Sequence, residues 1–301
     1  MPTRATMRSF RCALCELESR LCVMLDRQAR DLVVPGEEAG NSSGDHGQRY
    51  ALLPAVPSVM TKRRTAQLKL EILPQPDDTS CGPTCLHAVY SYWGDKLSLD
   101  SVADEIEPLP GGGTLAVSLA CHALRRGYRA EIYTYNLQLF DPTWFDGAVD
   151  LAERLRSQRK HKRTQRLKIS TDAYLEYLQL GGTVRFEELR PALIRRFLNR
   201  DVPILTGLSA TYLYNCAREH EDDYDDVRGE PVGHFVVLSG YDRNKRQVTV
   251  SDPSQDNPRF RTHRYSVGIS RLIAAIALGV MTYDANLLIL TPQTDRGAGH
   301  P

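Results

Sequence analysis

A buried helix that begins at a cysteine is the feature that most restricts how this chain can fold. After Cys81 the apolar residues recur at helical spacing as far as Trp93, and Gly94 ends the pattern. We expect Ser80 to cap the first turn, where Pro83 is tolerated because the early N–H groups of a helix have no intrahelical partner. The positive end of the helix favours the thiolate, which is the nucleophilic form of cysteine.

A glutamine stands shortly before this cysteine. The loop between Gln75 and Cys81 is short enough for the glutamine amide to reach back toward the sulfur. A thiolate that attacks a carbonyl carbon creates an oxyanion, and a positioned N–H donor stabilises that charge. Gln75 is therefore the candidate donor of an oxyanion hole, and Cys81 is the candidate nucleophile.

The histidine with the best surroundings for a general base is His234. It starts a buried apolar run, and the alternating run from Gln247 to Asp252 is the predicted hairpin partner of that strand. A turn centred on Arg243 places His234 opposite Asp252, whereas a slip of one residue would put their side chains on opposite faces. The carboxylate would hold the imidazole while its other nitrogen faces the thiol.

Each of these residues also has an ordinary structural interpretation. A cysteine in an apolar helix is usually a small buried hydrophobe, which is how we interpret Cys85, Cys121 and Cys216. A histidine that leads a strand is commonly structural, and Asp-Pro after a strand is often only a turn. The combination is more specific, because His234 follows Cys81 by about 150 residues, a separation typical of papain-type enzymes.

Three motif blocks carry a family resemblance. The blocks run from Gln75 to Leu86, from Gly233 to Val237 and from Ser251 to Pro253. Over roughly residues 68 to 292 the chain resembles the bacteriocin-processing cysteine peptidases, which cleave after double-glycine leaders, and their soluble stand-alone relatives. It is also similar to a bacterial peptidase-like subgroup whose domain stands alone or follows an acetyltransferase.

The resemblance implies both a fold and a set of roles. It implies a papain-like fold, with Cys81 as nucleophile and His234 as general base and acid. It further implies Asp252 as the partner that orients the histidine and Gln75 as the oxyanion-hole donor. The expected activity is cleavage of a peptide or amide bond, with a peptide or protein as substrate.

Two departures from the transporter-linked members concern the substrate. The sequence has no apolar stretch near the ~20 residues that span a bilayer, so we expect a soluble protein without a membrane partner. Between the motif blocks lies a long helical section, approximately residues 143 to 200, that a minimal processing peptidase would not need. Specificity for a leader peptide is therefore not expected to carry over.

Composition agrees with an ordinary globular enzyme. The chain has 301 residues, of which 42% are hydrophobic and 25% charged, and its formal charge of +1 argues against a nucleic-acid or membrane-surface partner. Seven unevenly spread cysteines do not form a disulfide framework, which favours a reducing, cytoplasmic location. The expected chemistry needs no cofactor and no metal.

The chain is expected to contain one catalytic domain with two flexible ends. Residues 1–60 are predicted to be a disordered extension, or to precede a true start at Met60. Residues 61–295 form the predicted peptidase domain, and residues 296–301 form a flexible tail. Cys12, Cys15 and Cys22 hint at zinc, but a tetrahedral site needs a fourth ligand and none is evident.

The order of secondary structure predicts an α+β fold with the cysteine-bearing helix packed on an antiparallel sheet. The glycines at 111–113 are predicted to form a turn before a helix, because they lack the Gly-Lys-Ser/Thr ending of a phosphate loop. Helices are expected at 81–92, 99–107, 115–126, 144–163, 172–180, 186–199 and 270–278. Strands are expected at 68–73, 129–135, 203–208, 234–241, 247–252, 263–267 and 286–290.

Two charge clusters lie between Cys81 and His234 in the sequence. The basic residues between Arg154 and Arg166 are interpreted as solvated surface. The acidic loop precedes His234, and we hypothesise that it is a lid that selects substrates by charge. Its members are Glu219, Glu221, Asp222, Asp223, Asp225 and Asp226.

Two other functions use the same residues. A papain-like acyltransferase would pass the acyl group from Cys81 to an amine or thiol instead of water. A peptide-binding module without catalysis is less favoured, because all four catalytic residue types are present. The order of preference is peptidase, transferase and binding module.

Overall fold

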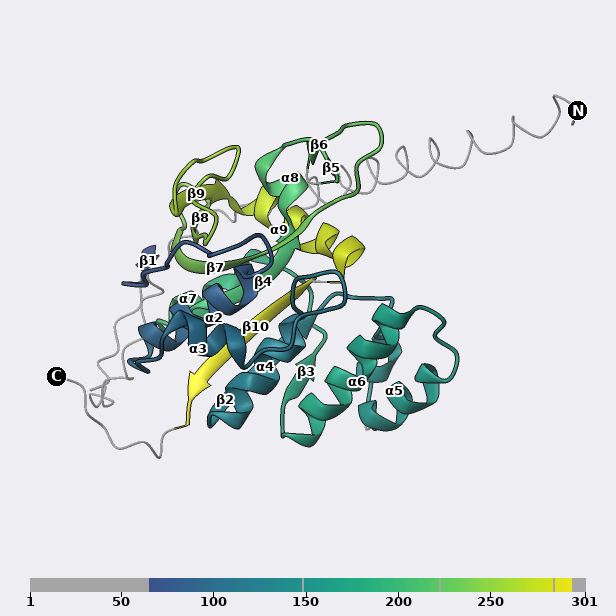
Figure 1. Cartoon of the computed structure of the whole chain (residues 1–301). Coiled ribbons are helices and arrows are strands. Elements are labelled where there is room, and N and C mark those ends of the chain that lie inside the picture. Colours follow the sequence, from purple (N-terminus) through teal and green to yellow (C-terminus); the bar gives the residue numbers. More distant parts are fainter. Residues whose placement is uncertain (1–64, 148, 222, 284, 294–301) are drawn as a thin grey trace, which may run out of the picture. The chain divides into compact units, whose positions relative to one another are not determined.

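A computed structural model of the chain describes residues 65–147, 149–221, 223–283 and 285–293 (Figure 1). All of these belong to the unit Val59–Pro301. The predictions of a disordered extension, of a zinc site near Cys12 and of a flexible tail concern segments outside the described residues. Within the described ranges, no helix is both long and apolar enough to cross a membrane.

A mostly antiparallel sheet forms the centre of the unit (Figure 1). Its strands follow the order β3-β2-β10-β4-β7-β8-β9, and β1 pairs with β7. Among the described strands of this sheet, β2 and β3 pair in parallel and the other pairs are antiparallel. The strands are β1 (Thr65–Gln67), β2 (Tyr128–Thr134), β3 (Thr183–Arg185), β4 (Ile204–Ser209), β7 (Gly233–Asp242), β8 (Gln247–Ser251), β9 (Arg264–Gly268) and β10 (Asn286–Pro292).

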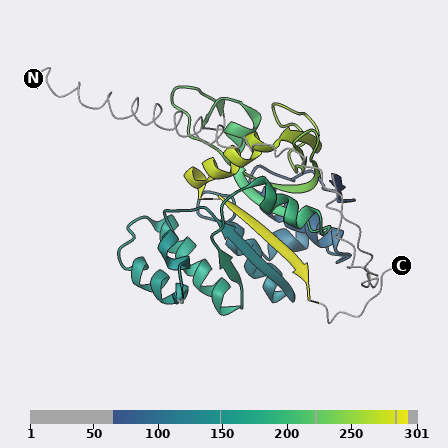
Figure 2. The same ribbon diagram turned by 180° about the vertical axis from the view of Figure 1, so that it is seen from behind.

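Helices cover both faces of this sheet. Helices α2 and α4 lie on one face, and α7 and α9 lie on the other (Figures 1 and 2). The central strand β4 is consequently buried at every position. The helices are α2 (Cys81–Tyr92), α3 (Leu99–Asp104), α4 (Ala116–Arg125), α5 (Leu151–Arg159), α6 (Gln165–Gln179), α7 (Pro191–Leu198), α8 (Ala210–Tyr214) and α9 (Ile269–Leu278), with short 3-10 turns at Pro142–Phe145 and Gly279–Thr282.

The predicted α+β class, with the cysteine-bearing helix packed on an antiparallel sheet, is confirmed. The glycine turn is also present, since Gly111, Gly112 and Gly113 all have positive φ values and α4 begins shortly after them. The predicted strands at 129–135, 203–208, 234–241, 247–252, 263–267 and 286–290 agree with the structure to within two residues at each end.

Several predicted elements are wrong in detail. The expected strand at 68–73 is absent, and β1 lies just before it. The single helix expected at 144–163 is a 3-10 turn followed by α5, and α6 starts earlier than expected. Helix α7 begins only at Pro191, because proline is tolerated in the first turn of a helix but not in its interior.

The register of the β7–β8 hairpin differs from the predicted one by three residues beside the turn, where Asp242 pairs with Gln247, and by two residues at the end near His234. Ser251 pairs with Val237, and the pairing is irregular between Leu238 and Gly240. Side chains alternate between faces with a period of two, so a two-residue shift keeps His234 on the same face as Asp252. The two side chains therefore meet diagonally rather than directly across the hairpin.

The crossing of α2 over β7 brings the helix start to the strand that carries His234. Gly82 packs against Phe235, and a Cβ atom on Gly82 would overlap with the hydroxyl of Thr114. The Cys85 thiol donates to the carbonyl of Phe235 at 3.3 Å. These contacts place Cys81, the residue before Gly82, beside the start of β7.

We expect Gly82→Ala to destabilise the protein by about 1–3 kcal/mol, because an extra methyl group in a well-packed core forces neighbouring side chains and backbone to move. Urea unfolding measures the change. Adding Thr114→Ala should restore most of the lost stability, since it removes the hydroxyl that the new methyl group meets. That hydroxyl has no hydrogen-bond partner among the described residues, so its loss alone should cost little. A double variant no more stable than Gly82→Ala would contradict this account.

Candidate active site

Cys81 is the first residue of α2 and is 8% exposed. Its N–H therefore belongs to the helix end, where amides have no intrahelical acceptor. The predicted side-chain cap from Ser80 is wrong. Ser80 occupies the N-cap position, but its hydroxyl donates to Asp77 Oδ2 at 2.6 Å.

The turn before Cys81 is organised by Asp77. Besides the Ser80 hydroxyl, its carboxylate accepts the backbone N–H of Thr79 at 2.8 Å and the Thr79 hydroxyl at 2.7 Å. These bonds lower the pKa of Asp77, so it remains an ionised acceptor at neutral pH. Asp77 thereby holds the chain in the tight turn that leads into the helix.

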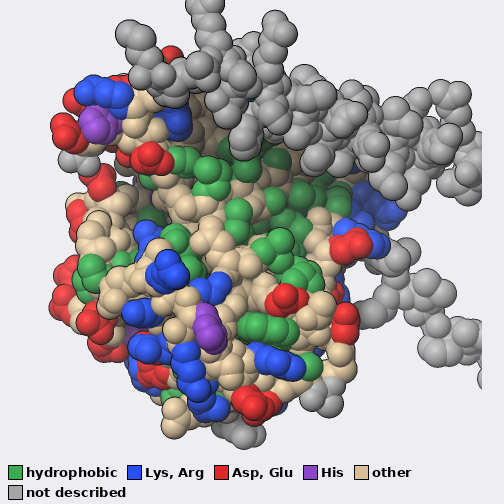
Figure 3. All heavy atoms as spheres, turned by 90° about the vertical axis from the view of Figure 1, so that its right-hand side faces the viewer, with side chains coloured by type: hydrophobic (Ala, Val, Ile, Leu, Met, Phe, Trp, Pro, Cys, Tyr) green, Lys and Arg blue, Asp and Glu red, His purple; other side chains and the backbone are tan. Residues whose placement is uncertain are grey.

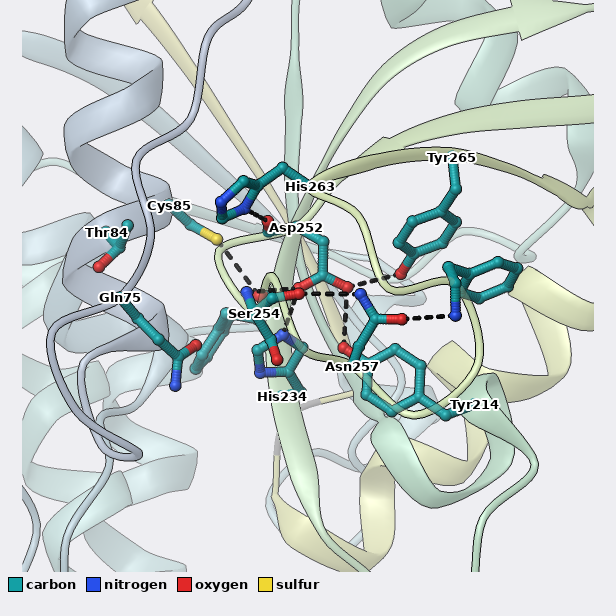
Figure 4. A network of polar contacts seen from close by, with 12 residues as sticks. Gln75, Thr84, Cys85, Tyr214, His234, Asp252, Ser254, Asn257, His263 and Tyr265 are labelled. Atoms are coloured by element: carbon teal, nitrogen blue, oxygen red, sulfur yellow. Dashed lines mark hydrogen bonds and ion pairs between the residues drawn. The ribbon is translucent and has the colours of Figure 1, made fainter.

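His234 and Asp252 form a hydrogen bond in the interior. The distance between His234 Nε2 and Asp252 Oδ1 is 2.9 Å (Figure 4). The histidine is 7% exposed and the aspartate is fully buried. Because Asp252 engages Nε2, the nitrogen left for the sulfur of Cys81 is Nδ1.

The proton affinity of His234 reflects both neighbours. Burial lowers the pKa of His234, but the charge of Asp252 and hydrogen bonds with Asp252 and Cys81 outweigh burial and raise the pKa to about 10. The Cys81 side chain is thus close enough to act on the imidazole. A histidine with these partners carries its proton at neutral pH and lies beside the Cys81 side chain.

Asp252 accepts hydrogen bonds on both carboxylate oxygens. Oδ1 accepts from His234 and from the backbone N–H of Ser254 at 2.9 Å. Oδ2 accepts from the hydroxyls of Tyr214 at 2.8 Å and Tyr265 at 2.6 Å (Figure 4). Burial raises the pKa of Asp252, but the histidine and these donors lower it overall, so the group stays ionised.

The two tyrosines are functional-site residues that the sequence did not reveal. Tyr214 ends α8, and Tyr265 lies within β9. For Tyr265, the sequence signal was that it belongs to a predicted strand close to the one that ends at Asp252. A strand pattern does not predict which tyrosine hydroxyl will contact a buried carboxylate.

Gln75 is tied to the loop that follows Asp252. Its backbone N–H donates to the Pro253 carbonyl at 3.0 Å, and its Nε2 donates to the Asp77 carbonyl at 2.9 Å. Figure 4 shows its side chain pointing from the loop before α2 toward the strand that carries His234. The second N–H of the amide remains for another acceptor.

The other cysteines occupy different environments. Cys85 and Cys121 are buried, as predicted, and burial raises the pKa of both thiols. Cys216, which follows α8, is less buried than predicted, because it packs against the core but remains partly exposed. Among the described residues, no cluster of three or more His, Cys, Asp or Glu side chains is arranged to hold a metal ion.

A cavity of about 310 Å³ lies beside the His234 end of β7. Its wall includes Ser209, Tyr212, Leu278 and Met281. Ser209 pairs with Gly233, the neighbour of His234. Figure 3 shows hydrophobic side chains gathered in a hollow on one face of the molecule.

The acidic loop contains a small hairpin of β5 (Glu219–His220) and β6 (Asp223–Tyr224). Asp225 then closes a turn by accepting the backbone N–H groups of Val227 and Arg228. It also forms an ion pair with the Arg228 side chain at 2.6 Å. One of the predicted lid carboxylates is therefore committed to the loop itself, and the role of the loop as a lid stays a prediction.

Comparison with known proteins gives one family match. The Peptidase_C39 like family matches residues 65–267, a span that contains Gln75, Cys81, His234 and Asp252. None of the curated proteins compared with the chain matches it significantly.

Three solved structures resemble the chain at low identity. A double glycine motif protease from an AMS/PCAT transporter, in complex with the leader peptide, is 13% identical, with a TM-score of 0.37 over 76% of this chain and 95% of that one. The peptidase domain of Streptococcus ComA, a bifunctional ABC transporter of a quorum-sensing pathway, is 13% identical, with a TM-score of 0.35 over 74% and 99%. Xylellain, a cysteine protease from Xylella fastidiosa, is 12% identical, with a TM-score of 0.39 over 77% and 87%.

The raised pKa of His234 predicts how stability depends on pH. Because this pKa rises from its ordinary 6.5 to about 10, the folded state binds the proton more tightly than the unfolded chain. The resulting stabilisation is complete below the unfolded pKa of 6.5 and is lost as pH rises through about 10. We expect the free energy of unfolding to fall across this window, and to fall less steeply in Asp252→Asn. Urea titrations at a series of pH values test this, and equal slopes for the two proteins would refute it.

Proposed function

The chain belongs to the Peptidase_C39 like family, and from this premise we propose that it is a cysteine peptidase that hydrolyses a peptide or amide bond. Cys81 is the nucleophile, His234 is the general base and acid, and Asp252 orients the histidine. Gln75 donates a hydrogen bond to the oxyanion.

One observation carries the proposal. The buried hydrogen bond between His234 Nε2 and Asp252 Oδ1 leaves Nδ1 for Cys81, at the positive end of α2. In a triad the acid fixes the orientation of the imidazole, and the imidazole exchanges a proton with the nucleophile. The raised pKa of His234, to which Cys81 contributes, supports a thiolate–imidazolium pair.

The reaction has two stages. The thiolate of Cys81 attacks the carbonyl carbon, and the electron pair of the C=O bond moves to oxygen. When this intermediate collapses, the C–N bond breaks and imidazolium of His234 gives its proton to the departing amine. Water then attacks the thioester while His234 takes its proton, and the carboxylic acid product leaves with the thiolate restored.

The oxyanion has two candidate donors. The N–H of Cys81 lies at the start of α2, where helical amides lack intrahelical acceptors. The second N–H of the Gln75 amide is not used by its bond to Asp77. Donors that are already positioned stabilise developing charge without having to reorganise during the reaction.

A peptide is the proposed substrate class. The cavity walled by Ser209, Tyr212, Leu278 and Met281 offers an apolar surface beside the His234 end of β7. Apolar walls with a few polar groups suit a peptide side chain next to its main chain.

We expect a thiol-directed activity probe to label the protein at Cys81 and a peptide library to be cleaved by it. Both should be lost in Cys81→Ala, because the nucleophile is gone. Cys121→Ala, which removes a cysteine of α4 outside the proposed peptide cavity, should retain both. Mass spectrometry of the labelled protein and of the products provides the measurement.

The outcomes separate the functional classes. Labelling with hydrolysis supports the peptidase. Labelling with turnover only after an amine or thiol is added supports an acyltransferase instead. Absence of Cys81-dependent labelling leaves a peptide-binding module and rejects the proposed chemistry.

Gln75→Ala should reduce kcat on a cleaved library peptide by about 10²–10³-fold, with little change in KM, because an oxyanion donor acts mainly in the transition state. Alkylation of Cys81 by iodoacetamide involves no oxyanion and should proceed at the wild-type rate. A matching loss in both assays would mean that Gln75 supports the turn before Cys81 rather than the oxyanion.

A further inference from the structure

The carboxylate of Asp252 is held from two sides. Its Oδ1 accepts from His234 and the Ser254 N–H, and its Oδ2 accepts from the hydroxyls of Tyr214 and Tyr265. A carboxylate oxygen has room for about two hydrogen bonds, so both oxygens are saturated. We propose that Tyr214 and Tyr265 are positioning residues that keep Asp252 ionised and aimed at His234. This inference rests on the proposed function and adds two residues to its machinery.

The geometry allows the tyrosines to act as a clamp. Tyr214 approaches from the end of α8 and Tyr265 from β9, so the two donors belong to separate elements of the fold (Figure 4). Rotation of the carboxylate about its Cβ–Cγ bond would break bonds on both oxygens at once. The hydroxyls therefore fix which oxygen faces the imidazole.

Hydroxyl donors suit this position better than a cation would. A buried carboxylate without partners is costly, and each hydrogen bond to a charged group offsets part of that cost. An arginine or lysine would neutralise Asp252 and compete with the imidazolium of His234. Tyrosine hydroxyls stabilise the negative charge and leave it available to the histidine.

The tyrosines keep their protons over the working pH range. Burial is the largest cause that raises the pKa of Tyr214, and the charge of Asp252 raises it further. The same two causes, in the same order, raise the pKa of Tyr265. Each hydroxyl is therefore a permanent donor, whereas a titrating group would release Asp252 at some pH.

An aromatic cover shields the clamp from water. Phe260 stacks on Tyr265 with ring centroids 3.8 Å apart and planes 7° apart. It meets the ring of Tyr214 edge-on at 6.5 Å. The ring of Tyr214 also lies 6.1 Å from that of His234, so one residue contacts both the histidine and the Asp252 carboxylate.

The loop that carries Phe260 is closed at its base on Asp252. The Asp252 N–H donates to the His263 carbonyl at 2.8 Å, and His263 Nδ1 lies 2.7 Å from the Asp252 carbonyl. Within the loop, Asn257 donates to the carbonyls of Ser254 and Thr262 and accepts the N–H of Phe260 at 2.7 Å. The loop is thus built around the same aspartate that the tyrosines hold.

The test measures the rate at which iodoacetamide alkylates Cys81 as a function of pH, in the full chain and without substrate. Tyr214→Phe and Tyr265→Phe remove only a hydroxyl that lowers the pKa of Asp252. Asp252 should then take up a proton at a higher pH, which weakens the thiolate–imidazolium pair. In the wild type the alkylation rate rises with pH as the thiolate forms. In each variant we expect this rise to occur about one pH unit higher, so that the rate at a given pH within the rise is about tenfold lower.

Two controls separate positioning from a general structural effect. Tyr177→Phe removes a buried hydroxyl that donates to the Ala130 carbonyl at 2.7 Å, and it should leave the rise in rate at the wild-type pH. In an Asp252→Asn background, Tyr265→Phe should change the rate by less than about twofold, because the group that it positions is gone. The inference would be overturned if the rise in rate occurred at the wild-type pH in both tyrosine variants. It would also be overturned if Tyr265→Phe reduced the rate as much in the Asp252→Asn background as in the wild type.

Peptide hydrolysis, measured separately, distinguishes this inference from the proposed function. If the alkylation profile shifts in the tyrosine variants but the wild type shows no Cys81-dependent hydrolysis, the positioning role of the tyrosines is supported and the peptidase proposal is rejected. If the wild type hydrolyses peptides but the profile does not shift, the peptidase proposal is supported and the positioning role is rejected.

Discussion

The close packing of α2 against β7 is the contact on which the candidate site depends. Gly82 follows Cys81, and Phe235 follows His234, so the contact between Gly82 and Phe235 brings the preceding residues together. The bond from the Cys85 thiol to the Phe235 carbonyl anchors the next turn of the helix to the same strand position. A Cβ atom at position 82 would overlap with the Thr114 hydroxyl, which explains why this position suits glycine.

The second constraint is electrostatic and concerns the buried carboxylate of Asp252. A charged group taken out of water is tolerated only when it is paired and its hydrogen-bonding capacity is filled. Here the histidine, a backbone N–H and two tyrosine hydroxyls meet both requirements. A fully satisfied polar network in a low dielectric also rigidifies its members. The same bonds that make the charge tolerable therefore give the imidazole a fixed orientation beside the thiol.

Local patterns identified much of the fold and of the site. The helix that starts at Cys81 was predictable because apolar periodicity and a tolerated early proline are properties of neighbouring residues. The strand that carries His234 was predictable for the same reason. The predicted register between β7 and β8 was wrong because the turn is centred between Asn244 and Lys245 rather than on Arg243, which shifts the pairing beside the turn by three residues. The irregularity near Ser239 reduces this shift to two residues, and a strand pattern predicts neither the turn centre nor the irregularity.

The sequence by itself determined the chemical types at the site and the elements that carry them, since Cys81, His234 and Asp252 each sit at a locally readable boundary of a helix or strand. Only the tertiary structure decided that Tyr214 and Tyr265 meet Asp252. The physical reason is that a hydrogen bond between distant segments depends on where side-chain tips meet after packing. Sequence spacing records periodicity along one element, and it contains no information on which hydroxyl reaches a carboxylate on another.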